Sequence, residues 1–192
     1  MKRFLLLAVI SLLIVIPSIV FAKTAYTNLE DTLTAEGLKL ENKDYEESDD
    51  QVTIYMFRGQ GCSHCLDFLT YLNSISKEYG DKFKLRAYEV WNNEDNINLQ
   101  GEVAQFLGTN VNKGSVPYVI VGKTTIVGFG EDDKKKLTDA IDSEYEKTDK
   151  YDVMKEMKPT EKEKKSKGII TYVIIGVLAV LVIFFLTRKS ED

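Results

Sequence analysis

The chain of 192 residues is poor in cysteine and histidine, and contains only Cys62, Cys65 and His64. A structural zinc site wants four Cys or His ligands, so these three residues argue against zinc. Covalent haem attachment requires a histidine directly after the second cysteine, where this chain has Leu66. We therefore expect no metal and no cofactor.

The chain also lacks a strong excess of either sign of charge, because 25 basic residues nearly balance 30 acidic ones and the formal net charge is only −5. The basic residues are not gathered into a patch interleaved with aromatic side chains, so nucleic acid is not an expected partner. Apolar segments at both ends leave about 120 residues for a compact core, which is enough for one domain and too few for two.

The N-terminus begins with the basic pair Lys2-Arg3, followed by an apolar run that ends at Pro17. Small or apolar residues then lead to Ala22. This arrangement is typical of a secretory signal peptide over residues 1–22, cut after Ala22. An uncleaved membrane anchor stays open, because the segment is nearly long enough to span a bilayer. In both cases the chain that follows leaves the cytoplasm.

A second apolar run covers residues 169–186 and contains no charge. At about 1.5 Å per residue it reaches roughly 27 Å, which predicts a transmembrane helix. Arg188 and Lys189 follow it and are expected in a cytoplasmic tail. Several lysines before the span favour the reverse orientation, so a cytoplasmic domain stays an alternative. We expect the extracytoplasmic side, because the N-terminal signal sets the orientation first.

Composition changes several times between these ends. An acidic stretch is expected to be a solvated arm with one short helix, and a charged stretch containing Pro159 is expected to be a stalk. The expected order is signal peptide 1–22, acidic arm 23–50, folded domain 51–147, charged stalk 148–168, transmembrane helix 169–186 and cytoplasmic tail 187–192.

The apolar pattern of the folded domain predicts the order of its strands and helices. Residues 52–57 form a continuous apolar run, as expected for a strand buried on both faces. A helical pattern from Cys65 to Tyr79 and an alternating strand near 83–88 follow, which implies a parallel crossover. Next come a helix over 99–107, a hairpin over 116–121 and 124–129, and a helix from 131 to 145. This predicts an α/β fold with a central mixed sheet flanked by helices.

Cys62 and Cys65 lie three positions apart at a junction between a strand and a helix. Such a pair can exchange a disulfide with another molecule. Unpaired N–H groups at the helix start favour an anion, so Cys62 is the expected nucleophile and Cys65 resolves the mixed disulfide. A purely structural disulfide is the alternative, although it would close too small a loop to stabilise much.

The order of elements, the Cys-x-x-Cys at the first helix and Val116-Pro117 opening a strand together resemble the thioredoxin superfamily, over about residues 50–147. The resemblance implies a thioredoxin-like fold, a cis peptide bond at Pro117 against the disulfide, and pairing of the Val116 backbone with substrate. Without the resemblance, an X-Pro bond would be expected to be trans.

The residues between the two cysteines bear on the redox potential. His64, if charged or donating toward the Cys62 sulfur, would stabilise the thiolate and make the disulfide a stronger oxidant. The Cys-x-His-Cys pattern resembles the oxidising DsbA type. Ser63 stands where the family commonly has proline, and with Val116 it is a candidate substrate contact. A solvent-facing His64 without influence remains the alternative.

Many superfamily members carry a buried carboxylate six residues before the first cysteine, and this chain has Met56 there. Glu89 continues the apolar face of the second strand near its C-terminal end, and is therefore a candidate proton relay for Cys65. The alternative is a Glu89 that is simply exposed where the strand ends. Arg58 is expected to be a solvated charge.

Together these observations predict a thiol-disulfide oxidoreductase tethered to the cell membrane by a single span, with its domain on the extracytoplasmic side. It would oxidise protein thiol substrates and be reoxidised by a membrane redox partner. One alternative is a disulfide reductase of the cytochrome-maturation or bacteriocin-accessory type. The other is a tethered thioredoxin-like module that binds a partner without catalysis.

Overall fold

The computed structural model describes residues 26–157 and 175–176. The expected signal peptide and cytoplasmic tail lie outside the described residues, as do the stalk beyond residue 157 and all of the expected transmembrane helix except 175–176. Within the described ranges, none of the helices combines the length and the apolar character needed to cross a membrane.

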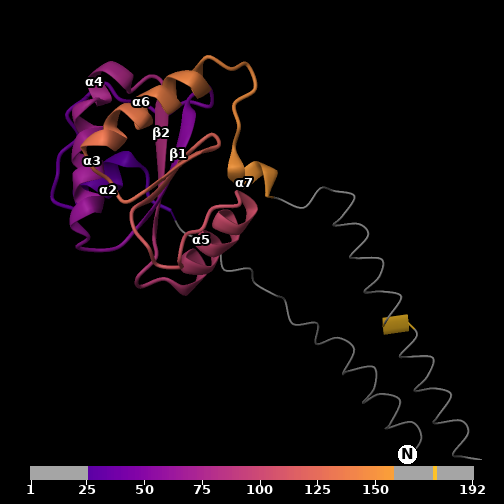
Figure 1. Ribbon diagram of the computed structural model, residues 1–192. Helices are drawn as coiled ribbons and strands as arrows, with labels where there is room; N and C mark the ends of the chain where they lie inside the picture. Colours follow the sequence, from indigo (N-terminus) through magenta and orange to yellow (C-terminus); the bar gives the residue numbers. More distant parts are fainter. Residues whose placement is uncertain (1–25, 158–174, 177–192) are drawn as a thin grey trace, which may run out of the picture.

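A four-stranded mixed sheet forms the centre of the domain (Figure 1). β1 runs parallel to β2 and antiparallel to β3, and β3 forms a hairpin with β4. The predicted parallel crossover and hairpin are therefore confirmed. The strands are β1 (Val52–Arg58), β2 (Phe83–Glu89), β3 (Tyr118–Val121) and β4 (Thr124–Val127), in the spatial order β2-β1-β3-β4.

Helices cover both faces of this sheet (Figure 1). The helices are α2 (Leu29–Ala35), α3 (Ser63–Ser74), α4 (Ser76–Tyr79), α5 (Glu94–Phe106), α6 (Glu131–Tyr145) and α7 (Val153–Glu156). Residues of α2, α3 and α6 pack into one buried cluster, and residues of α5 and α7 pack into the other. The predicted helix over 65–79 is divided at Ile75, where the Ser74 hydroxyl donates to the Tyr71 carbonyl at 2.7 Å and competes with the helical bonds.

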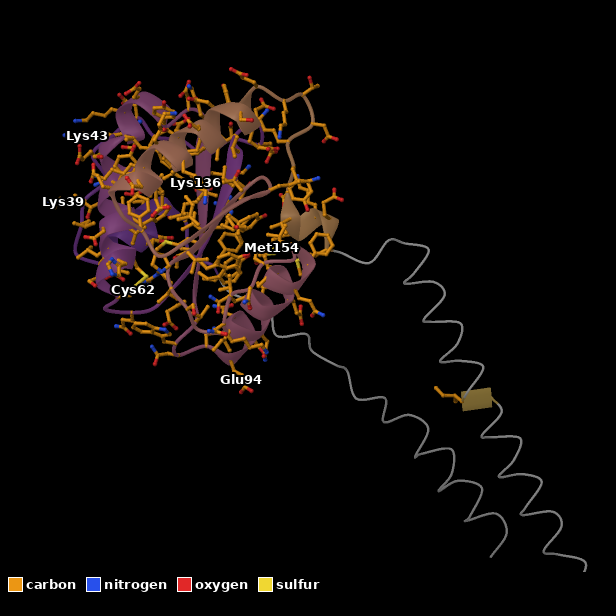
Figure 2. The ribbon with its side chains drawn as sticks, in the orientation of Figure 1. Lys39, Lys43, Cys62, Glu94, Lys136 and Met154 are labelled. Atoms are coloured by element: carbon orange, nitrogen blue, oxygen red, sulfur yellow. A yellow bond between two sulfur atoms is a disulfide. The ribbon has the colours of Figure 1, made fainter. Side chains whose placement is uncertain are left out.

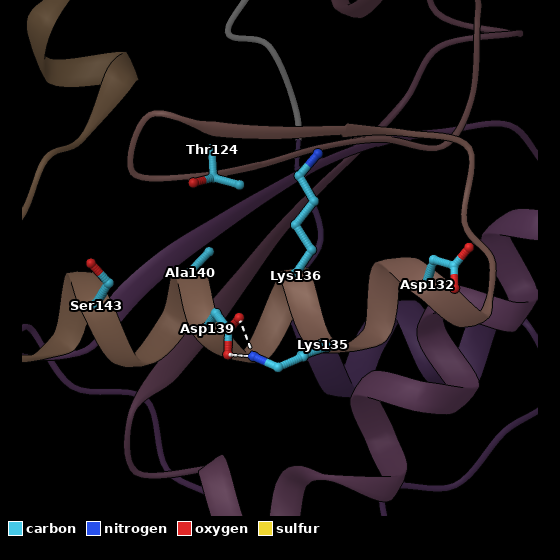
Figure 3. Close-up of a pocket in the computed structure, with 7 residues that line it drawn as sticks. All are labelled: Thr124, Asp132, Lys135, Lys136, Asp139, Ala140 and Ser143. Atoms are coloured by element: carbon cyan, nitrogen blue, oxygen red, sulfur yellow. Dashed lines mark hydrogen bonds and ion pairs between the residues drawn. The ribbon is translucent and has the colours of Figure 1, made fainter.

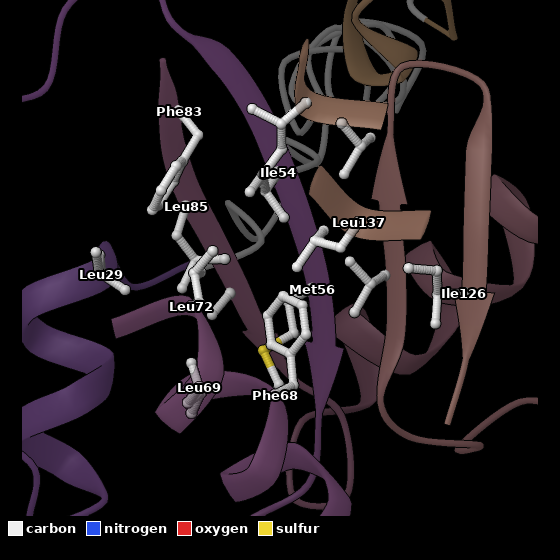
Figure 4. Close-up of a cluster of buried hydrophobic side chains, with 14 of the residues drawn as sticks. Leu29, Ile54, Met56, Phe68, Leu69, Leu72, Phe83, Leu85, Ile126 and Leu137 are labelled. Carbon is white, nitrogen blue, oxygen red and sulfur yellow. The ribbon is translucent and has the colours of Figure 1, made fainter. Parts of the chain in front are cut away.

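Alternate residues of β1 enter the two clusters, which explains its unbroken apolar pattern. Ile54 and Met56 belong to the cluster under α2, α3 and α6, and Tyr55 and Phe57 belong to the cluster under α5 and α7. Figure 4 shows the first cluster, to which both Phe68 of α3 and Met56 of β1 belong. A strand buried on both faces positions whatever follows its C-terminal end, and here that is the loop leading to Cys62.

The segment before β1 does not form the solvated arm that we expected. Leu29 and Leu33 are fully buried in the first cluster, and the backbone of Thr27 exchanges two 2.9 Å hydrogen bonds with Ala87 of β2. The two leucines lie four positions apart on one face of α2, which is enough to dock the helix, while its acidic residues face outward. The Asn73 side chain also holds the backbone of residues 39 and 41.

The first residues of the expected stalk likewise pack on the sheet. Asp152 caps α7 by accepting from the backbone N–H groups of Met154 and Lys155, and it also accepts a 2.8 Å hydrogen bond from the Tyr55 hydroxyl. Val153 is buried in the second cluster. Burial, together with the hydrogen bond to Asp152, raises the pKa of Tyr55 well above its ordinary value, so Tyr55 remains a donor.

Candidate functional site

Cys62 and Cys65 form a disulfide at the N-terminus of α3, with their Cα atoms 5.2 Å apart. Cys62 is the N-cap residue, and its sulfur accepts a 3.2 Å hydrogen bond from the Cys65 backbone N–H. Cys65 is buried with 2% exposure, whereas Cys62 is only half buried. Figure 2 shows Cys62 at the end of the molecule where α3 begins. The accessible sulfur is therefore the predicted nucleophile.

The loop from β1 to α3 is a tight turn. The Cys62 N–H donates to the Gly59 carbonyl at 3.2 Å, and Gly61 has a φ of +76°, a conformation that side chains rarely adopt. This turn ends the strand and starts the helix within a few residues. As a result, the Cys65 N–H in the first turn of α3, which has no partner within the helix, points to the Cys62 sulfur.

The peptide bond between Val116 and Pro117 is cis, as the resemblance implied. Pro117 is buried, and its carbonyl accepts a 2.8 Å hydrogen bond from Gly128, which extends the hairpin pairing by one step. Val116 is half buried and packs against the first cluster. This cluster contains Cys65, and Cys62 packs against it as well. The structure thus brings the cysteine pair and the Val116-Pro117 step to one end of the sheet.

His64 lies on the exposed side of α3. Its Nδ1 is 3.5 Å from a carboxylate oxygen of Asp67, and both side chains are about two-thirds exposed. Sequence reasoning missed Asp67, although a residue three positions along a helix is a regular partner. The influence of His64 on Cys62 stays a prediction, as does the substrate contact of the exposed Ser63.

Glu89 joins two loops at the same end of the sheet. Its carboxylate accepts hydrogen bonds from the backbone N–H groups of Trp91 at 3.0 Å, Asn92 at 2.9 Å and Gln60 at 3.4 Å. Gln60 belongs to the turn before Cys62, so Glu89 acts on the position of that turn. A proton-relay role for Glu89 stays a prediction.

Replacing Glu89 by glutamine tests which role applies. We expect the free energy of unfolding to fall by about 1–3 kcal/mol, because an amide presents its own N–H₂ group to backbone donors that need an acceptor. Urea unfolding of the full chain measures this loss, with Glu94→Gln as the control on the exposed start of α5. If Glu89 is instead a relay, the variant resolves mixed disulfides more slowly and with a changed pH profile.

The loop before Pro117 is held by two residues that sequence reasoning also missed. The amide of Gln100, which is buried in α5, accepts from the Gly114 N–H at 2.6 Å and donates to the Ser115 carbonyl at 2.7 Å. The indole N–H of Trp91 donates to the Gly114 carbonyl at 3.0 Å. A single glutamine gives no signal of burial in the sequence.

Arg58 is not the solvated charge that we expected. It ends β1, its side chain is only 9% exposed, and it forms an ion pair with Glu36 at the end of α2. The docking of α2 explains the difference, because it covers the strand end that would otherwise face water. The pair joins the segment before β1 to the residues leading into Cys62.

A hollow on the described surface lies elsewhere. It has a volume of about 500 Å³ and lies between β4 and α6, where Lys135 pairs with Asp139 (Figure 3). Lys136 donates to the Thr125 carbonyl, so both lysines already have partners. None of the candidate site residues lines this hollow. Residues 26–157 and 175–176 also contain no group of three or more His, Cys, Asp or Glu able to hold a metal ion.

No protein-family model and no curated protein matches the sequence. Among solved structures, a thioredoxin-like protein from Clostridium perfringens matches with 23% identity over 51% of this chain and 74% of its own, at a TM-score of 0.36. The germline-specific thioredoxin Deadhead from Drosophila melanogaster matches with 18% identity over 50% and 82%, at 0.31. The thioredoxin-like assignment of the fold therefore rests on the strand order, the cysteine pair and the cis peptide bond.

Proposed function

We propose that this chain is a thiol-disulfide oxidoreductase that exchanges disulfides with protein substrates through Cys62 and Cys65. One observation carries the proposal. The disulfide caps the N-terminus of α3, with one sulfur accessible and the other buried, at the sheet end that also holds the cis Val116-Pro117 step. A bond that only stabilised the fold would close a loop too short to contribute much.

The exchange follows from this asymmetry. A substrate thiolate attacks the Cys62 sulfur, the Cys62–Cys65 bond breaks, and Cys65 leaves as a thiolate that takes a proton. A second substrate thiolate then attacks the substrate sulfur of the mixed disulfide and releases Cys62. The substrate loses two electrons and two protons to the cysteine pair. Return to the starting state requires a disulfide-bearing or quinone-linked oxidant, which we assign to a membrane redox partner.

The helix terminus favours oxidation as the direction. The Cys65 N–H already points to the Cys62 sulfur, and the first turn of α3 contains no acidic residue that would repel a thiolate. Both features stabilise the reduced state, which makes the disulfide the stronger oxidant.

The reduction potential tests the direction. We expect a reduction potential of about −120 mV, as for strong oxidants. A reductase of the alternative type would have a reduction potential of about −270 mV. The measurement equilibrates the full chain in detergent micelles with glutathione buffers and counts free thiols by alkylation. His64→Ala is the matched variant. If it lowers the potential, the imidazole contributes to thiolate stability; an unchanged potential assigns the effect to the helix terminus alone.

We also propose that residues 169–186 anchor the chain in the membrane, joined through residues 158–168 to the domain on the extracytoplasmic side. The uncharged apolar run and the signal pattern of residues 1–22 support this arrangement. A membrane-impermeant thiol reagent, applied to intact cells after mild reduction, should modify Cys62. Labelling that requires opened cells contradicts the orientation.

A further inference from the structure

Trp91 is the only tryptophan of the chain, and 52% of it is exposed in the loop after β2. It is nevertheless held at three points. Its indole N–H donates to the Gly114 carbonyl, its backbone N–H donates to Glu89, and its ring packs on the backbone of Gly59. An exposed ring with this many attachments is positioned rather than left to move in solvent.

The contact with Gly59 is close enough to require glycine. A Cβ atom at that position would lie only 2.2–2.5 Å from three ring carbons of Trp91, so any side chain there would displace the indole. With its polar group bonded inside the protein and one face covered by Gly59, the indole presents only its apolar surface to solvent.

The two backbone segments that hold the ring carry the proposed chemistry. The Gly59 carbonyl accepts from Cys62, and Gly114 lies two residues before Val116 in the loop that leads to the cis proline. The indole therefore bridges the loop of the attacking sulfur and the loop of the proposed substrate contact. A polypeptide that reaches both loops passes beside it.

Carboxylates outnumber cations in the segments next to this ring. Glu94 and Asp95, both exposed, occupy the first turn of α5 just after Trp91, and the Glu89 carboxylate lies beneath the loop. Lys113, next to Gly114, donates to the neutral Asn98 amide at 2.9 Å and keeps its positive charge, so Glu89, Glu94 and Asp95 leave the local balance negative. Figure 2 shows Glu94 and Cys62 toward the same end of the molecule. A cation is attracted by these carboxylates, and an indole face is the best aromatic surface for it.

We propose that the exposed face of Trp91 binds a cationic side chain, above all arginine, of the substrate segment that contains the exchanging cysteine. The inference rests on the proposed function and names its substrate class: cysteine-containing polypeptide segments of positive charge. Arginine suits the site better than lysine, because its planar guanidinium stacks on an indole while its N–H groups meet carboxylates. Trp91 thereby determines specificity, and the exchange itself belongs to the cysteines.

Two model peptides test this assignment. They share one cysteine and differ at one neighbouring residue, which is arginine in the first and its neutral isostere citrulline in the second. The oxidised full chain in detergent micelles reacts with each, and the ratio of the two kcat/KM values is the measured quantity. We expect a two- to fivefold preference for arginine, which corresponds to about the strength of an exposed cation–π contact.

Variants then locate the source of the preference. Trp91→Leu should bring the ratio to about one, and Trp91→Phe should keep part of it, because phenylalanine has a weaker π face. The control is Phe106→Leu, another exposed aromatic at the opposite end of α5, which should leave the ratio unchanged.

Two outcomes overturn the proposal: a wild-type ratio of one, or a preference that persists in Trp91→Leu. Oxidation of dithiothreitol separates this result from a failure of the proposed function. A wild-type chain that oxidises dithiothreitol without preferring arginine overturns the role of Trp91 alone. A chain that does not oxidise dithiothreitol contradicts both.

Discussion

Cys62→Ser is expected to reduce disulfide exchange by at least about 10³-fold, because serine removes both the accessible sulfur and the bond that a substrate thiolate attacks. The assay follows oxidation of a reduced model protein by the full chain in detergent micelles. Thr70→Ala, on an exposed position of the same helix, is the matched control and should retain the wild-type rate. A rate for Cys62→Ser close to that of the control would place the chemistry elsewhere in the chain.

Cys65→Ala provides the complementary result. The variant keeps the Cys62 thiolate, which can attack the disulfide of an oxidised substrate in the reverse of the proposed exchange. Because no Cys65 thiolate is present to displace that substrate, the mixed disulfide should accumulate on Cys62 and become visible on non-reducing gels. Identifying these substrates would show whether they carry the positive charge expected from Trp91. If a variant lacking both cysteines still restores function in cells, the chain is a binding module and the exchange reaction is not its role.

Glu36→Ala should cause the largest loss of stability among single charge removals in the described domain. We expect the free energy of unfolding to fall by about 3–5 kcal/mol, because the change leaves the Arg58 guanidinium buried without a counter-charge. Urea unfolding of the full chain in detergent micelles, followed by the fluorescence of Trp91, provides the measurement.

Two further variants separate this explanation from others. Glu30→Ala removes an exposed carboxylate from the same helix and should change stability by less than about 0.5 kcal/mol. The double variant Glu36→Leu with Arg58→Met should recover most of the loss, because apolar residues of similar volume replace buried pairs well. Equal effects of Glu36→Ala and Glu30→Ala would mean that the pair contributes no more than a surface contact.

Local patterns were sufficient for the elements that carry the chemistry. The apolar run of β1 and the alternation of β2 marked two strands. A strand buried on both faces has a continuous run of apolar residues, whereas a strand buried on one face alternates apolar and polar residues. The spacing of Cys62 and Cys65 at a strand-helix junction located the disulfide. The cis bond at Pro117 came only from the resemblance, because nothing in the residues beside it demands that isomer.

The elements that surround the site depended on contacts between distant parts of the chain. Arg58 meets Glu36 only because Leu29 and Leu33 dock α2, and the acidic composition of that segment hid the two leucines. The Trp91 ring packs on Gly59, which lies in a different loop, so the sequence near either residue does not indicate this contact. Such contacts follow from the tertiary structure, whereas composition and periodicity report only on neighbours along the chain.

The places where the chain enters and leaves the described domain have a practical consequence. The Tyr26 ring meets Tyr88 edge-on with centroids 5.8 Å apart, and Met157 packs against the same cluster as Tyr88. The disulfide borders the cluster on the opposite face of the sheet. Domains whose two ends share a face tolerate insertion into a host protein. Grafting residues 26–157 into a host loop should therefore leave the sulfurs unobstructed.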